Sequence, residues 1–75
     1  MSERLPSVRP DDVIRALKRE GWEIKRQRGS HVVLRRRGHP LLVTVPMHRR
    51  DVPKGTLRAI ITDAGMTVEE FVSLL

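Results

Sequence analysis

The chain has 75 residues, no cysteine and a formal net charge of +6, with an isoelectric point near 11.3. This length leaves little room for a second core, so we expect a single domain over residues 1–75. The lack of cysteine excludes a disulfide framework and a thiolate metal site. No apolar run is long enough to span a membrane, and the N-terminus does not resemble a signal peptide. We therefore expect a cytoplasmic protein without membrane contact.

The chain begins with an expected extended arm over residues 1–8, followed by a helix over residues 10–20. Pro10 suits the first helical position, where its missing N–H costs nothing. The helix is amphipathic, because apolar residues recur at helical spacing at Val13, Ile14 and Leu17. Gly21 suits the position just after a helix end.

Three strands are expected next, over residues 22–27, 31–36 and 41–45. In the first strand we expect Trp22 and Ile24 to face inward. Trp22 could instead stack on a base, although a tryptophan beside a helix end more often belongs to a core. The register of the second strand is open, because Val32 and Leu34 lie on one face and Val33 lies on the other. His39 is interpreted as a polar residue of the turn that joins the last two strands.

The remaining residues predict a loop over 47–52 and two helices. Pro53 opens the first of these helices, whose expected buried face is Leu57, Ile60, Ile61 and Ala64. A capping box at residues 67–70 opens a short last helix that ends near Leu74. The element order is α-β-β-β-α-α, which predicts an α+β fold with a three-stranded antiparallel sheet and the helices on one face. This is the order of double-stranded-RNA-binding domains.

The positive charge is concentrated in the middle of the chain. From residue 24 to residue 50 there is no Asp or Glu, while the same span carries eight Lys and Arg residues. An ordinary solvated surface mixes both signs of charge, so a one-sided distribution indicates an anionic partner, most often a nucleic acid.

A histidine inside this basic span is the strongest candidate for chemistry. Gly29 allows a sharp turn, and Ser30 and His31 lead directly into a strand-forming run at residues 32–34. Histidine side chains can take or give a proton near neutral pH, and neighbouring cations favour the neutral imidazole. The alternative is an ordinary polar residue at a strand end, but the surrounding cations favour a catalytic role.

Three motifs in this order resemble the HicA family of toxins: Gly29-Ser30-His31, Val45-Pro46-Met47-His48, and Lys54-Gly55-Thr56-Leu57-Arg58-Ala59-Ile60. The resemblance covers residues 8–75 and implies a double-stranded-RNA-binding-like fold. It also implies an mRNA interferase, the toxin of a type II toxin–antitoxin system, that inhibits translation by cleaving mRNA. By the same resemblance, His31 is the catalytic histidine and an antitoxin of the HicB kind binds and blocks it.

Basic and polar residues around His31 are the expected RNA contacts, namely Lys25, Arg26, Arg28, Ser30, Arg35, Arg36, Arg37, His48 and Arg49. Among them, Arg26, Arg28 and Arg35 are the nearest in sequence that could stabilise a phosphorane-like charge. Ser30 either orients the phosphate or holds the turn. His48 is either a second proton carrier or a hydrogen-bonding loop residue.

Metal-dependent cleavage is not expected. The middle of the chain lacks the carboxylates that two-metal nucleases use, and the three histidines have no standard ligand spacing. We therefore expect a metal-independent endoribonuclease that needs no cofactor. Two alternatives stay open: a non-catalytic RNA-binding module, and an interaction protein whose basic face docks an acidic partner.

Overall fold

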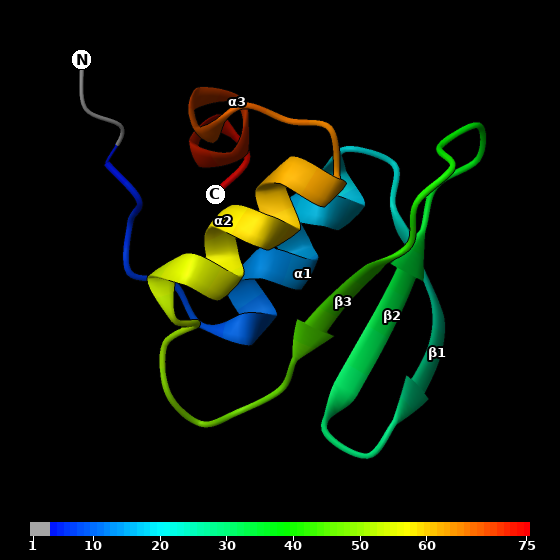
Figure 1. Cartoon of the computed structure of the whole chain (residues 1–75), viewed down its shortest axis with the longest axis horizontal. Coiled ribbons are helices and arrows are strands. Elements are labelled where there is room, and N and C mark those ends of the chain that lie inside the picture. The colour runs from blue at the N-terminus through cyan, green and yellow to red at the C-terminus, as the bar shows by residue number, and fades with distance from the viewer. Residues whose placement is uncertain (1–3) are drawn as a thin grey trace.

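The computed structural model describes residues 4–75, which form a three-stranded antiparallel sheet with three helices on one face (Figure 1). In chain order the elements are α1 (Pro10–Arg19), β1 (Glu23–Arg28), β2 (His31–Arg35), β3 (Val43–Pro46), α2 (Lys54–Asp63) and α3 (Val68–Ser73). The strand order is β1-β2-β3, so β2 is central and its two neighbours are edge strands. The α+β class and the α-β-β-β-α-α order predicted from the sequence are confirmed.

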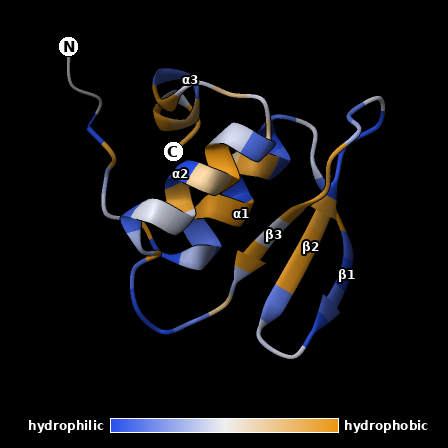
Figure 2. Cartoon of the chain, viewed as in Figure 1, coloured by the Kyte–Doolittle hydropathy of each residue, from blue (hydrophilic) through white to orange (hydrophobic). Residues whose placement is uncertain are grey.

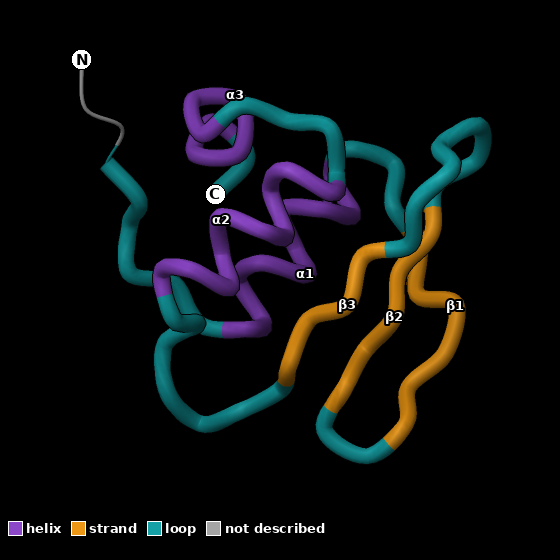
Figure 3. The backbone as a smooth tube through the Cα atoms, in the orientation of Figure 1, coloured by secondary structure: helices purple, strands orange, loops and turns teal. Residues whose placement is uncertain are grey.

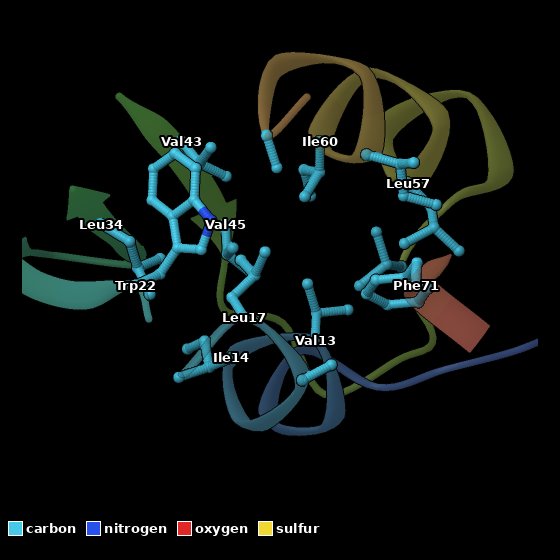
Figure 4. Close-up of a cluster of buried hydrophobic side chains, with 14 of the residues drawn as sticks. Val13, Ile14, Leu17, Trp22, Leu34, Val43, Val45, Leu57, Ile60 and Phe71 are labelled. Atoms are coloured by element: carbon cyan, nitrogen blue, oxygen red, sulfur yellow. The ribbon is translucent and has the colours of Figure 1, made fainter. Parts of the chain in front are cut away.

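One hydrophobic core joins the helices to the sheet (Figure 4). Alternate residues of the two strands nearest the helices are buried, and the helices add the apolar stripe of α1, the buried face of α2 and the aromatic ring of α3. These residues include Val13, Leu17, Val32, Leu34, Val43, Val45, Leu57, Ile60 and Phe71. Burying each such side chain contributes about 1.5–3 kcal/mol, which makes this layer the main source of stability.

The register of β2 follows from this core. Val32 and Leu34 belong to the core cluster, whereas Val33 is buried but lies outside it, on the sheet face turned away from the helices. We call that face the open face. Residues opposite one another in a ladder share a face, so the ladder partners of Val33 also belong to the open face. Those partners are Arg26 of β1 and Thr44 of β3.

The N-terminal arm is tied to the start of α2. The Val52 N–H donates to the Val8 carbonyl at 2.8 Å, and Lys54 Nζ donates to the Leu5 carbonyl at 2.8 Å. The arm expected over residues 1–8 can be followed from residue 4 onward, since residues 1–3 lie outside the described part.

The capping box predicted at the start of the last helix is confirmed, because Glu70 N–H donates to Thr67 Oγ1 at 3.1 Å and Thr67 N–H donates back to Glu70 Oε1 at 2.8 Å.

Ile24 points inward as predicted, but it is not buried. Ile24 pairs with Leu34 and faces the helix side, yet 43% of it is exposed, because α1 and α2 pack over β3 rather than over the edge strand β1. The third strand also begins later than predicted. Leu41 and Leu42 precede its first ladder pair, Leu34 with Val43, and remain exposed. Figure 2 shows the result, with β1 hydrophilic and the middle of β2 hydrophobic.

Candidate functional site

His31 stands at the entrance of β2, directly after a two-residue hairpin loop. Gly29 has a φ of +56°, a conformation that favours glycine, and no other heavy atom lies within 4 Å of where its Cβ would be. A positive φ at the first loop position only is the pattern of a type II′ turn, which matches the twist of the flanking strands. The turn therefore fixes where β2 begins, and it leaves the His31 side chain exposed.

The ladder places His31 on the open face between two neighbours. Arg28 of β1 lies directly opposite on one side, and Pro46 of β3 lies directly opposite on the other. Side chains in such positions have Cβ atoms about 4.5–5.5 Å apart. A guanidinium and an imidazole are thus presented side by side on a surface that no helix covers.

An irregularity in β1 sets which basic residues join His31. The ladder steps from Ile24 opposite Leu34 to Arg26 opposite Val33, so Lys25 is an extra residue in β1. In a regular ladder Lys25 would lie opposite Val33, and Arg26 and Arg28 would turn toward the helices. The bulge thus puts both arginines on the open face with His31.

The loop after β3 reaches the same end of the sheet (Figure 3). The Met47 N–H donates to the Ser30 carbonyl, which ties the start of this loop to the hairpin turn. His48 and Arg49 follow directly and are exposed. They therefore lie at the His31 end of β2, and Ser30 has a backbone role in holding the turn.

The three consecutive arginines at positions 35 to 37 lie at the other end. From His31 to Arg35 the strand advances four residues, about 13 Å. Arg35 pairs with Glu23 at 3.5 Å, and Arg36 pairs with Glu20 at 3.7 Å. The sequence groups Arg35 with Arg26 and Arg28 as neighbours of the histidine. In the fold Arg35 and Arg28 lie at opposite ends of the β1–β2 ladder, and Arg26, opposite Val33, lies midway between His31 and Arg35.

A comparison with protein-family models matches residues 10–66 to the HicA toxin of bacterial toxin-antitoxin systems. The match runs from α1 through α2 and includes the whole sheet. This chain belongs to the HicA toxin family. A comparison with curated proteins gives no match. Family membership makes this HicA-type chain the toxin component of a toxin–antitoxin pair, with an antitoxin as its partner.

Trp22 is a core residue of this HicA toxin and does not serve as a stacking platform. It is 2% exposed, and its indole Nε1 has no hydrogen-bond partner within residues 4–75. Its ring meets the ring of His39 in a T-shaped contact, with centroids 4.9 Å apart and planes at 65°. The alternative of base stacking is therefore excluded by burial.

His39 has a larger structural role than a polar turn residue. Its Nε2 lies 2.7 Å from the carbonyl oxygen of Asp63, at the C-terminal end of α2. Its Cε1 would lie 3.2 Å from a Cβ built on Gly65, whose φ is +73°. His39 thus ties the β2–β3 loop to the core and to α2. Sequence analysis missed this role because a single histidine beside a proline and a glycine gives no signal of a contact 24 residues away.

Within residues 4–75, no group of three or more His, Cys, Asp or Glu side chains could together hold a metal ion. In the same part of the chain, no helix is long and apolar enough to cross a membrane. On the helix side, Asp12 accepts hydrogen bonds from the Arg9 N–H at 3.1 Å and from Arg15 at 3.0 Å. These two bonds lower the pKa of Asp12.

Proposed function

We propose that this HicA-family toxin is an endoribonuclease that cleaves mRNA by acid–base catalysis at His31. The observation that supports this most is the position of His31, which is exposed on the open face and directly opposite Arg28. A phosphodiester laid on this face would meet a proton carrier and a cation together. General acid–base catalysis needs a residue within hydrogen-bond reach of the moving proton, and an exposed strand entrance leaves room for the substrate.

RNA brings its own nucleophile to this reaction. In the proposed step the 2′-OH loses its proton and its oxygen attacks the neighbouring phosphorus, while the bond from phosphorus to the 5′-oxygen breaks. His31 takes the first proton or supplies the one that the leaving 5′-oxygen needs. The products are a 2′,3′-cyclic phosphate and a 5′-hydroxyl. Arg28 stabilises the extra negative charge on the phosphorus oxygens, since a guanidinium presents N–H donors in a fixed fork.

Other basic residues of β1 and of the loop after β3 would bind the RNA around the cut. Arg26 shares the open face, Lys25 is exposed at the bulge, and Arg49 is exposed on the loop that Ser30 anchors. His48 follows the anchor point of this loop and is the candidate for the second proton carrier. In this proposal no metal or cofactor takes part, because side chains and the substrate's own hydroxyl supply every group that the step requires.

The antitoxin of the pair is proposed to be an acidic protein of the HicB kind that covers the open face. Covering this face would shield His31 and compete with RNA in one event, and opposite charges would speed the encounter. The proposed setting is the cytoplasm, where mRNA is available, and the proposed unit is one domain over residues 1–75.

The test uses RNA in which the 2′-OH at the mapped cut site is replaced by hydrogen. The wild type should cut the all-ribose RNA in EDTA, leave 2′,3′-cyclic phosphate ends, and fail to cut the 2′-deoxy RNA. Cleavage of the 2′-deoxy RNA would overturn the attack by the 2′-OH, while the protein would still be an RNase. Binding of RNA without cleavage under any condition would overturn the enzyme and leave a non-catalytic RNA-binding module.

A further inference from the structure

A polar hollow lies at the end of the sheet away from His31. It has a volume of about 390 Å³ and is lined by Glu23, Arg35, Arg36, Arg37, His39 and Leu42. We call it the arginine pocket. His31 is not part of its wall, so the catalytic proposal leaves this hollow without a role.

The three arginines meet in one hollow because the strand ends between them. Along a regular strand, consecutive side chains point to opposite faces. Here β2 ends at Arg35, and the chain turns at once, with the His39 N–H donating to the Arg36 carbonyl at 3.0 Å. The turn breaks the alternation, and all three arginines line the same hollow.

The wall of the pocket is held in place from behind. His39 is fixed between the Trp22 ring and the Asp63 carbonyl, and the bare Cα of Gly65 leaves the space that its ring occupies. A loop tied to the core in this way keeps its shape without a ligand, so less conformational entropy is lost when a ligand binds.

The chemistry of the pocket suits a nucleotide. Three guanidinium groups face one lining carboxylate, Glu23, which leaves an excess of two positive charges among the lining residues. The ion pairs of Arg35 with Glu23 and of Arg36 with Glu20 are exposed and 3.5–3.7 Å long, so they are weak and engage few of the five N–H donors on each guanidinium. Leu42, 42% exposed, adds an apolar surface for a base or ribose.

We propose that the arginine pocket binds a nucleotide of the RNA strand away from the cut, with its phosphate on the arginines. The inference rests on the proposed function, because it places the scissile phosphate at His31. The distance of about 13 Å along β2 corresponds to at most about four nucleotides at 3.4 Å each. Arg35 lies on the open face opposite Glu23, so one strand of RNA can follow that face from His31 to the pocket.

Binding is tested first in the uncut complex. Arg37→Gln is placed in a His31→Ala background and titrated with a single-stranded RNA of about twelve nucleotides. Losing one phosphate contact should weaken binding about 5–20-fold and lower the salt slope by about 0.7. The matched control is Arg15→Gln, which removes the same charge from an exposed residue of α1 and should change affinity less than twofold. Equal RNA affinity in the two variants would overturn the proposal that the arginine pocket binds RNA, and it would leave the catalytic proposal untouched.

Position is tested next, with the wild-type His31 and RNAs in which single phosphates are replaced by neutral methylphosphonates. One linkage away from the cut should lower kcat/KM in the wild type, and this loss should disappear in Arg37→Gln. Sensitivity confined to the scissile phosphate would overturn the proposal. If no cleavage occurs at all, the proposed function fails, while the binding titration still decides whether the pocket holds RNA. Weaker antitoxin binding with unchanged RNA binding would assign the pocket to the protein partner and overturn the RNA site.

Discussion

The two faces of β2 differ in burial, and the proposed function assigns them different roles. Val32 and Leu34 are 2% and 0% exposed and pack with the helices. His31 and Arg35 share the other face and are exposed. A strand whose side chains alternate between faces can therefore carry stability and chemistry on neighbouring residues without mixing them. In this arrangement, substitutions on the helix side should cost stability, and substitutions of the exposed residues on the open face should cost activity.

The largest expected effect on the open face is that of His31→Ala. Cleavage should fall about 10²–10⁴-fold, the usual worth of general acid–base catalysis, when measured as single-turnover rates. RNA affinity should stay within a few-fold, and the free energy of unfolding should change by less than about 0.5 kcal/mol, because the side chain is exposed. Undiminished cleavage would show that His31 is not the acid–base residue. A large loss of stability would show that the open face also contributes to folding.

The matching change on the helix side is Leu34→Ala. Leu34 is fully buried, so the free energy of unfolding should fall by about 2–5 kcal/mol in a urea titration. A domain of this size has little stability in reserve, and a large part of the protein should unfold. Activity per folded molecule should be unchanged. Leu34→Met keeps the side-chain volume and should lower the free energy of unfolding by less than about 1.5 kcal/mol. Equal losses for both variants would contradict the explanation that Leu34→Ala destabilises the protein by leaving a cavity.

The bulge in β1 offers a comparison between two residues of the same strand that carry equal charge. Arg28 lies opposite His31, whereas Lys25 is the extra residue that the ladder leaves out. Arg28→Gln should lower kcat/KM about tenfold or more, because in the proposed mechanism it removes the cation that stabilises the scissile phosphate. Lys25→Gln should lower it less than threefold. Similar effects from the two substitutions would mean that net charge matters and the register does not.

The sequence predicted the helix side of the molecule far better than the open face. Apolar periodicity predicted α1, α2 and the alternation of β3, because apolar residues recur at the positions that each element buries. The bulge at Lys25 could not be predicted, since several registers give β1 an acceptable pattern of exposed residues. For the same reason the sequence grouped Arg35 with Arg28, although the strand separates them. The contacts of His39 depend on tertiary packing and gave no local signal.

A smaller effect is expected where the His39 ring packs against Gly65 behind the arginine pocket, a contact that we call the clasp. Gly65→Ala would place a methyl group 3.2 Å from the His39 ring on a backbone with a φ of +73°, so the free energy of unfolding should fall by about 1–2 kcal/mol. Gly55→Ala is the control, because it lies in α2 with open space around it and should stabilise the protein by about 0.5–1 kcal/mol. RNA affinity should fall in the first variant only, with the cleavage rate at saturating RNA unchanged. A loss confined to that rate would mean that the clasp serves the His31 end.

The smallest expected effect is a pH dependence on the helix side, at Asp12. The Arg9 N–H and the Arg15 guanidinium lower its pKa in the folded state below the ordinary value of 3.8. Asp12 therefore adds stability above pH 3.8, and this contribution is lost as the pH falls through the lower folded-state pKa. Asp12→Asn should lower the urea midpoint at neutral pH and converge with the wild type in acid.

Asp11→Asn is the matched control for this titration, because it removes the same charge from the same helix turn but not the hydrogen bond to the Arg9 N–H. At neutral pH its urea midpoint should lie closer to that of the wild type than the midpoint of Asp12→Asn does. Neither variant should change the pH profile of cleavage, since α1 packs on the side of the sheet away from His31. A shifted cleavage profile in Asp12→Asn would show that the two faces are coupled, and the separation of stability from chemistry along β2 would then be incomplete.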